Sequence, residues 1–590
     1  MEDERQKQEA GIPENAFREL KPGEEYIPVM RPDRQYPEVT PYSVIMGLVM
    51  AIIFSAAAAY LGLKVGQVFE AAIPIAIIAV GVSGALKKKN ALGQNVIIQS
   101  IGASSGIVVA GAIFTLPALY ILQAKYGDAI TVSFIEIFLS SMLGGVLGVL
   151  MFIPFRKYFV SDMHGKFPFP EATATTQVLI SGEKSGSQVK PLIIAGAVGG
   201  IYDFLLSTFG WWAETLTSKA TEFGAHVASQ AKMVFKINTG AAVLGLGYIV
   251  GLKYCFIIFA GSAFIWYVIV PLLGMSPEAA AIDPEVLFKT QARYIGIGGI
   301  AMSGIIGLLS MSGVVVRVVK RAIADLFSKG SAATGTLLRT QQDLPMTQIV
   351  FGSLLMAILF AVFFHVMCSE SLTQTVIAFV LVVLFALMLS VVGISSIAFT
   401  GNEPVSGMTI FMIIVSAVVM GGVGMSGKTG IIAILMMAAF LCATLAVSGN
   451  FMSELKVAYI TGATPKKMQQ WQLVSIVLAG IVSVGVVFLM HYAYGFTGED
   501  ALAAPQANAM AAIVKPMMDG GDAPWPLYMA GAFFAVLLWM MKIPPLAFAL
   551  GSYLPMGINT PVLVGGLISY FVSHSSDDAK VNAKRLSEGN

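Results

Sequence analysis

Charged residues are scarce in this sequence. They make up 12% of the 590 residues, whereas apolar residues make up 56% and the mean hydropathy is +0.78. A soluble domain usually carries about 25% charged residues, so this composition predicts a membrane protein embedded in a lipid bilayer. The formal net charge is only +2. Because the basic residues lie in separate loops, we expect no nucleic-acid partner.

Cysteine and histidine are also rare. The three cysteines (Cys255, Cys368 and Cys442) lie in apolar segments without a CxxC motif, so we expect them to be packing residues. The five histidines are scattered, HExxH does not occur, and no GxxxxGK[ST] follows a strand-like stretch. These absences argue against a metalloprotease and against an ATP-driven pump. We therefore expect no enzyme activity, no metal site and no bound cofactor.

Long apolar windows, in contrast, recur through the whole chain. A window of about 20 residues is long enough to cross a bilayer as a helix. Such windows lie at 42–63, 67–86, 95–122, 131–155, 191–210, 239–274, 293–316, 345–367, 373–399, 405–425, 428–447, 469–493, 526–541 and 543–573. The run 239–274 is divided at Lys253-Tyr254, and the last run is divided at its prolines and glycines. The pattern predicts an all-α polytopic membrane protein of about sixteen helices.

The loops between these windows predict the topology. Basic residues gather in loops such as 317–341, whereas 275–290 and 496–525 are rich in acidic residues. Placing the basic loops inside puts both termini in the cytoplasm, with the protein in the plasma (inner) membrane. The predicted regions are a polar tail (1–41), a first transmembrane half (42–316), a basic linker (317–344), a second transmembrane half (345–573) and a C-terminal tail (574–590).

One interrupted helix in each half points to internal symmetry. In the first half a helix ends near Lys64 and restarts through Glu70 and Pro74, and in the second half a helix ends near Gly401 and restarts at Pro404. The two interruptions run in opposite directions, as inverted repeats would. Broken helices in pseudo-symmetric halves usually form the central binding site of a transporter.

Two polar clusters in the second half, 401–404 and 448–456, are the strongest site candidates. Both are expected to interrupt their helices, and charged groups at membrane depth are costly unless they serve a function. The substrate-binding candidates there are Asn402 and Asn450, and the proton-coupling candidates are Glu403 and Glu454. In the alternative interpretation, 401–404 is a surface loop and Glu454 forms a surface pair with Lys456.

Other apolar segments contain further candidates. The substrate-binding set includes Lys64, Glu70, Asn95, Gln99 and Asn559, and the proton-coupling set includes Glu171 and Asp203. Lys64 and Glu70 could bind a zwitterion or form a surface turn. Asn95 and Gln99 share a helix face and could line a cavity or bond to another helix. Glu171 follows Pro170 and could simply complement a helix dipole.

Several ordered stretches together resemble a known family. They are AAAAYLGLKVGQVFEAAIP (56–74), NVIIQSIGASSG (95–106), FPFPEATATTQVL (167–179), LGLGYIVG (244–251), SGNFMSELKVAYITGATPKK (448–467) and YLPMGINTPVLVGGLIS (553–569). In this combination the chain resembles the oligopeptide transporter (OPT) family, which includes the yellow-stripe-like metal–chelate transporters.

The resemblance implies a secondary carrier of roughly sixteen helices, usually proton-coupled, that imports small peptides or metal chelates. We therefore expect import of short oligopeptides by proton symport and alternating access. Import of a metal chelate, recognised through its organic ligand, and coupling to sodium stay open as alternatives. A monomer and a homodimer are both compatible with the sequence.

Overall fold

The computed structural model describes most of the chain. The described residues are 13, 15–65, 71–127, 130, 133–167, 169–181, 189–327, 338–369, 371–400, 405–498, 501–502, 504–520 and 524–576. Apart from a two-stranded sheet, the regular structure within them is helical. Nine of the described helices are long and apolar enough to cross a membrane, and four shorter apolar helices accompany them. The all-α polytopic fold is confirmed, whereas the total of sixteen helices and the inverted symmetry stay predictions.

The chain forms two compact units, each assembled from two separate stretches of sequence. Unit 1 comprises Met1–Val189 and Gly307–Asp522, and unit 2 comprises Lys190–Ile306 and Ala523–Asn590. The units are defined by which residues contact one another, whereas the predicted halves 42–316 and 345–573 are continuous stretches of sequence, so the two divisions describe different properties. The predicted halves therefore stay a prediction.

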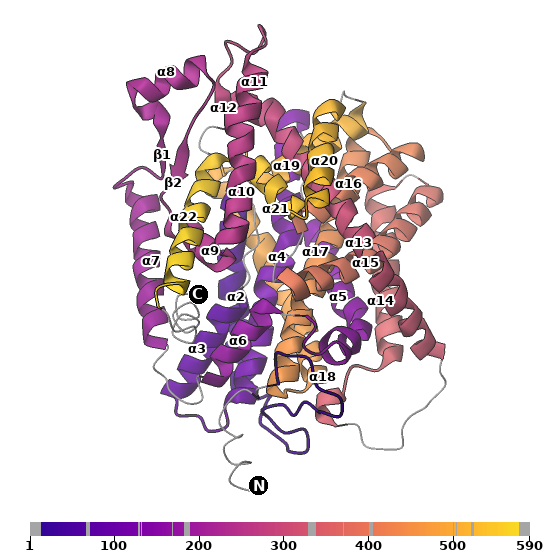
Figure 1. Ribbon diagram of the computed structural model, residues 1–590. Coiled ribbons are helices and arrows are strands. Elements are labelled where there is room, and N and C mark those ends of the chain that lie inside the picture. Colours follow the sequence, from indigo (N-terminus) through magenta and orange to yellow (C-terminus); the bar gives the residue numbers. More distant parts are fainter. Residues whose placement is uncertain are drawn as a thin grey trace. The chain divides into compact units, whose positions relative to one another are not determined.

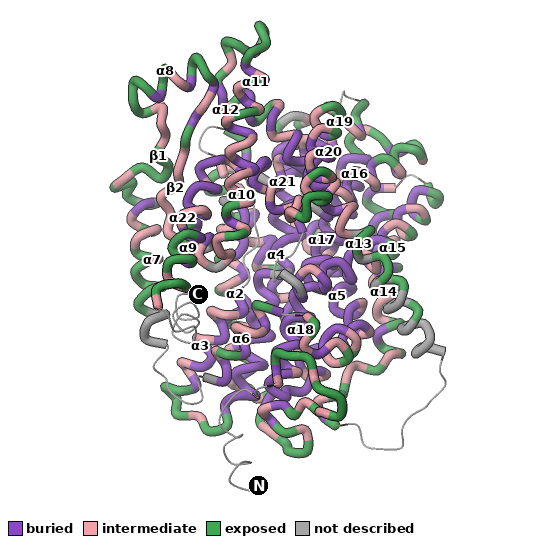
Figure 2. The backbone as a smooth tube through the Cα atoms, in the orientation of Figure 1, coloured by how far each residue is buried: buried purple, intermediate pink, exposed green. Residues whose placement is uncertain are grey.

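Unit 1 is a helical bundle with two buried helices at its centre. Its helices are α2 (Pro41–Val65), α3 (Ala72–Ala85), α4 (Leu92–Tyr126), α5 (Phe134–Phe152), α6 (Pro170–Ser181), the part of α13 (Arg293–Phe327) from Gly307 onward, α14 (Met346–Cys368), α15 (Leu372–Thr400), α16 (Val405–Gly422), α17 (Gly427–Thr461), α18 (Pro465–Tyr494) and α19 (Pro505–Asp519) (Figure 1). In α4 and α17 the most apolar window is 94% buried, and both helices are largely purple in Figure 2. A helix that is apolar on all sides suits such a central position.

Small residues allow these central helices to approach closely. Gly144 of α5 lies directly against the backbone of Phe440 in α17, and Gly111 of α4 lies against Ala439 of the same helix. In a membrane, glycine at such positions lets two backbones come within van der Waals contact. The glycine content of the chain therefore contributes to the packing of α17 against its neighbours.

The second polar cluster does not break its helix, so the predicted interruption at 448–456 is wrong. Helix α17 runs without a break from Gly427 to Thr461. Only Gly449 in this cluster strongly disfavours a helix, and the polar side chains are covered by neighbouring helices of unit 1. Glu454 and Lys456 are each 3% exposed. The alternative of a surface pair is therefore also wrong.

The other predicted interruption in the second half lies between two described helices. Helix α15 ends at Thr400 and α16 begins at Val405. In the first half, α2 ends at Val65 and α3 begins at Ala72. The connecting residues 66–70 and 401–404 lie outside the described part of the chain.

Unit 2 combines membrane-length helices with a small projection. Its elements are α7 (Val189–Phe209, from its second residue), β1 (Thr215–Thr217), α8 (Glu222–Gln230), β2 (Lys236–Asn238), α9 (Ala241–Val250), α10 (Leu252–Phe264), α11 (Val270–Gly274), α12 (Pro284–Leu287), the start of α13 (Arg293–Phe327), α20 (Trp525–Met540), α21 (Pro545–Tyr553) and α22 (Met556–Ser573). The antiparallel strands pair Thr215 with Asn238, and Figure 1 shows α8 at their outer end.

Both long apolar runs in unit 2 are divided as predicted, although the first break lies at Gly251, and Lys253-Tyr254 lies within α10. Gly251 separates α9 from α10 with a positive φ of 79°, a backbone conformation that glycine adopts without steric cost. The last run is divided at Leu554-Pro555, between α21 and α22. Pro561, however, lies inside α22, because neighbouring helices can accommodate a proline within a membrane helix.

The described part of the predicted N-terminal tail packs against unit 1. Residues 26–38, which we call the N-terminal strap, cross the turn between α17 and α18. The Met30 amide donates to Thr461 O (2.8 Å). Glu38 accepts hydrogen bonds from the amide (3.1 Å) and the hydroxyl (2.9 Å) of Thr464. The strap thereby attaches to the end of the helix that carries Asn450 and Glu454.

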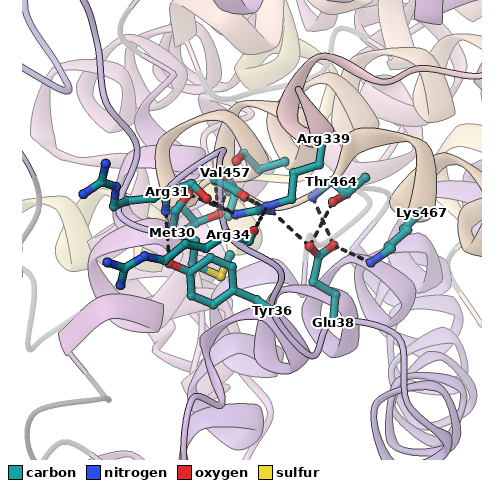
Figure 3. A network of polar contacts seen from close by, with 12 residues as sticks. Met30, Arg31, Arg34, Tyr36, Glu38, Arg339, Val457, Thr464 and Lys467 are labelled. Atoms are coloured by element: carbon teal, nitrogen blue, oxygen red, sulfur yellow. Dashed lines mark hydrogen bonds and ion pairs between the residues drawn. The ribbon is translucent and has the colours of Figure 1, made fainter. Parts of the chain in front are cut away.

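Arg339 joins the strap to the segment that follows α13. Its guanidinium contacts Glu38 Oε1 at 3.1 Å and donates to Arg34 O (2.7 Å), Met30 O (3.1 Å) and Gly462 O. The Glu38 side chain is fully buried and that of Arg339 is 8% exposed. In Figure 3 the two side chains point toward one another between the three segments that they connect.

Candidate functional site

A buried hydrogen bond between α4 and α17 forms the centre of the candidate site. Gln99 Nε2 donates to Glu454 Oε1 at 2.7 Å, although the two residues are 355 positions apart. Gln99 is fully buried and Glu454 is nearly so. Glu454 Oε2 and Gln99 Oε1 have no hydrogen-bond partner among the described residues. Two acceptor oxygens are therefore left at this point, and a cation or a proton could satisfy them.

A second carboxylate lies close to the first. Glu171, in the first turn of α6, interacts electrostatically with Glu454. Helix α6 packs against α17, and the Phe169 amide before it donates to Ala398 O (2.9 Å) near the end of α15. Glu171 thus occupies the predicted first turn of a helix and also lies within electrostatic range of a buried acid.

Asn450 lies on the same face of α17 as Glu454, one turn away. It is 4% exposed, and neither its amide nitrogen nor its amide oxygen has a described partner. A buried, unsatisfied polar group costs about 1–3 kcal/mol. Such a cost is tolerated where a ligand or water satisfies the group, so Asn450 is a reasonable substrate contact. Ser100 on α4 and Thr175 and Thr176 on α6 have unpartnered hydroxyls as well.

The remaining candidates of the first half lie elsewhere or cannot be placed. Asn95 donates to Ser83 Oγ at 2.9 Å and so connects α4 to α3, while its Oδ1 has no partner in the described region. Lys64 is in the last turn of α2, but its side chain is outside the described residues. The same holds for the whole of Glu70.

Asn402 and Glu403, the candidates between α15 and α16, also lie outside the described residues. The flanking residues nevertheless indicate where this connection begins. Ala398, four positions before Asn402, accepts the hydrogen bond from Phe169. The connection therefore starts close to the first turn of α6, which carries Glu171.

Two candidates belong to unit 2 and have local partners there. Asp203 Oδ1 accepts a hydrogen bond from the Ala241 amide (2.8 Å) at the first turn of α9. A carboxylate at a helix N-terminus complements the helix dipole. Asn559 Nδ2 donates to Gly551 O (2.9 Å) and thereby closes the turn between α21 and α22. These contacts give both side chains a structural role within unit 2.

Two buried polar residues of unit 1 were not expected from the sequence. Gln506, in the first turn of α19, is 1% exposed, and no described group bonds to either of its amide atoms. Lys456 is buried in α17, where its amine donates to Val160 O (3.2 Å) in the π-helical turn Lys157–Asp162. Gln506 lies in a loop-rich, weakly apolar region of sequence, so only its burial in the fold distinguishes it.

The chemistry of this arrangement is that of a buried acid pair. Repulsion between two neighbouring carboxylates disfavours the state in which both are ionised. Uptake of one proton, or binding of one ammonium group, relieves this repulsion, while amide groups such as Asn450 can bind a peptide backbone. The site could therefore exchange a proton for a cationic group.

Comparisons with known proteins identify the family of the chain. The family model described as "OPT oligopeptide transporter protein" matches residues 38–586. A protein of Haemophilus influenzae named "Putative oligopeptide transporter" is 27% identical over 577 residues, an alignment that covers 90% of this chain and 88% of the relative. Because the family model covers most of the sequence, the chain belongs to the OPT oligopeptide transporter family.

Proposed function

We propose that this protein imports short oligopeptides by proton symport with alternating access. The observation that carries the proposal is the buried contact of Glu454 with Gln99, next to the carboxylate of Glu171. Glu454 and Glu171 would take up the coupling proton, and Asn450 and Gln99 would bind the peptide. In this proposal the protein lies in the plasma membrane with both termini in the cytoplasm, as the basic loops favour.

Coupling would follow from the charge of the acid pair. With both carboxylates ionised, the buried site carries two negative charges, which favours the conformation in which water can solvate them. Binding of a proton and of the peptide's amino group neutralises the site and favours the alternative conformation. One charge crossing a potential of 100 mV is worth about 2.3 kcal/mol, enough for about fiftyfold accumulation of a solute.

Uptake into reconstituted proteoliposomes tests the proposal. Labelled tri- to hexapeptides and an iron chelate are offered with an inward proton gradient, with a sodium gradient and with no gradient. We expect accumulation of peptides above equilibrium only with the proton gradient. Accumulation driven by sodium, accumulation of the chelate alone, or equilibration without any gradient dependence would each replace the proposal by the corresponding alternative.

A conservative substitution tests the coupling residue. We expect Glu454→Gln to lower gradient-driven accumulation at least tenfold while its melting temperature stays near that of the wild type, since glutamine keeps the shape but cannot ionise. Glu136→Gln in the first turn of α5 is the matched control and should behave as the wild type. Wild-type accumulation by Glu454→Gln would remove this residue from the coupling role.

The same substitution at Glu171 separates its two interpretations. If Glu171 shares the coupling proton, Glu171→Gln loses gradient-driven accumulation. If it only complements the dipole of α6, the variant melts at a lower temperature and retains coupling.

A further inference from the structure

We propose that the N-terminal end of α19, together with Gln506, binds the C-terminal carboxylate of the transported peptide. This inference rests on the proposed function, because it assigns one end of the proposed substrate to a second site. The site lies in unit 1, apart from the acid pair, and takes an anion rather than a cation.

Helix α19 begins inside unit 1, beside the last turn of α2. The Ala504 amide donates to Leu63 O (2.9 Å) in the last turn of α2. At its other end, Asp519 accepts a hydrogen bond from Tyr126, the last residue of α4 (2.7 Å). The helix also packs against α16 and α17. Its N-terminal end therefore faces the interior, beside the point at which α2 stops.

This helix end has the electrostatic character of an anion site. No side chain caps α19 at Ala504, and its first turn contains no acidic residue. In the part of the chain that the structure describes, the amides of Gln506 and Ala507 have no acceptor. The aligned peptide dipoles place about half a positive charge at a helix N-terminus. Free amides at this position favour a bound carboxylate or phosphate.

The Gln506 side chain is the independent observation that points to a ligand. It is 1% exposed at the second position of α19, and both of its amide atoms lack a described partner. Burying a primary amide without hydrogen bonds is unfavourable. Its Nε2 can donate to a carboxylate oxygen, and its Oε1 can accept from the last peptide N–H. A peptide end would satisfy both atoms at once.

The distance from the acid pair agrees with the length of a peptide. Ser55 of α2 donates to Ser105 O of α4 (3.5 Å), and these two helices run in the same direction. Leu63 lies eight residues beyond Ser55, and Gln99 lies six residues before Ser105. At 1.5 Å per residue, the two sites are about 20 Å apart along the helix axes. An extended peptide of about six residues spans that distance, so its amino group would lie at the acid pair.

Equilibrium binding of a hexapeptide and of its C-terminal amide tests the assignment without requiring transport. With wild-type protein in nanodiscs, we expect the amide to bind at least tenfold more weakly than the free acid. Gln506→Ala should weaken binding of the acid more than binding of the amide, because only the acid loses a charged acceptor for Nε2, so that the ratio of the two Kd values falls. The control Gln348→Ala, an exposed glutamine in the first turn of α14, should keep the wild-type ratio.

A second variant keeps the test decisive if Gln506→Ala does not fold. Gln506→Glu has nearly the same shape and places a negative charge at the site, so it should bind the amide more tightly than the acid. A wild-type ratio in either folded variant overturns the assignment, as does equal binding of acid and amide by the wild type. If the wild type shows no proton-driven uptake but still binds the acid at least tenfold more tightly than the amide, the proposed coupling is overturned and the carboxylate site stands.

Discussion

His164 shows how one buried side chain can make the attachment of the N-terminal segment depend on pH. Its Nε2 lies 2.8 Å from Asn15 O, and its ring lies 5.0 Å from that of Tyr26 in the strap. Burial lowers the pKa of His164, and the nearby charge of Lys456 lowers it further, although the Asn15 carbonyl opposes both effects. The folded protein therefore favours the neutral imidazole.

Acidification should destabilise the protein through this residue. The unfolded chain binds a proton at His164 near pH 6.5, whereas the folded state resists protonation until a lower pH. The free energy of unfolding should therefore fall below about pH 6.5, by at most about 1.4 kcal/mol per pH unit from this group. Thermal unfolding between pH 7.5 and 5 measures the effect. The variant His164→Gln should have a smaller loss, and an identical pH dependence of both proteins would contradict the assignment.

At the scale of elements, the contact between α5 and α17 allows a direct test of packing. A methyl group at Gly144 would overlap the backbone of Phe440, which cannot move as a flexible side chain can. We expect Gly144→Ala to lower the free energy of unfolding by about 1–3 kcal/mol, a range typical of overpacking. Gly200→Ala in α7 is the control, because an added methyl group there meets nothing within 4 Å. Equal melting temperatures of the two variants would show that α5 and α17 can separate without cost.

The boundaries of the helices were largely predictable from the sequence. Hydropathy alone locates α14 and α18 to within a few residues, because membrane helices need long, uniform apolar runs. Hydropathy gives the wrong result at 448–456, where polar residues predict a helix break that the continuous helix α17 does not have. The polar residues of α17 are instead covered by α4 and α6, and such coverage depends on the tertiary structure.

The candidate site was predictable only in part. Gln99, Glu171, Asn450 and Glu454 were identified as unusual polar residues in apolar surroundings, and the fold brings Gln99 and Glu171 to Glu454. Their pairing could not be inferred, since partners hundreds of residues apart leave no local pattern. Gln506 was missed for a related reason: a glutamine in a polar loop region is ordinary until the fold buries it.

At the scale of the molecule, Arg339 holds together segments that are distant in sequence. Removing its guanidinium would leave buried Glu38 with Lys467 as its remaining ion-pair partner and would leave several carbonyl groups unsatisfied. Breaking a buried ion pair from one side typically costs about 3–5 kcal/mol. We expect Arg339→Ala to lower the melting temperature accordingly, as measured by thermal unfolding in detergent. Arg31→Ala, which removes an exposed pair with Asp33, is the control and should change little. A wild-type melting temperature for Arg339→Ala would exclude Arg339 as a residue that stabilises the protein through the strap.

The strap also determines the order in which the protein can be completed during synthesis. Glu38 and Thr464 are 426 residues apart, and at about 5–20 residues per second a ribosome needs roughly 20 to 90 seconds to connect them. During that interval Lys190–Ile306, the first stretch of unit 2, is also made. Unit 1 can therefore close only after part of unit 2 has entered the membrane, and its earliest residues must wait, unpaired, for nearly the whole chain.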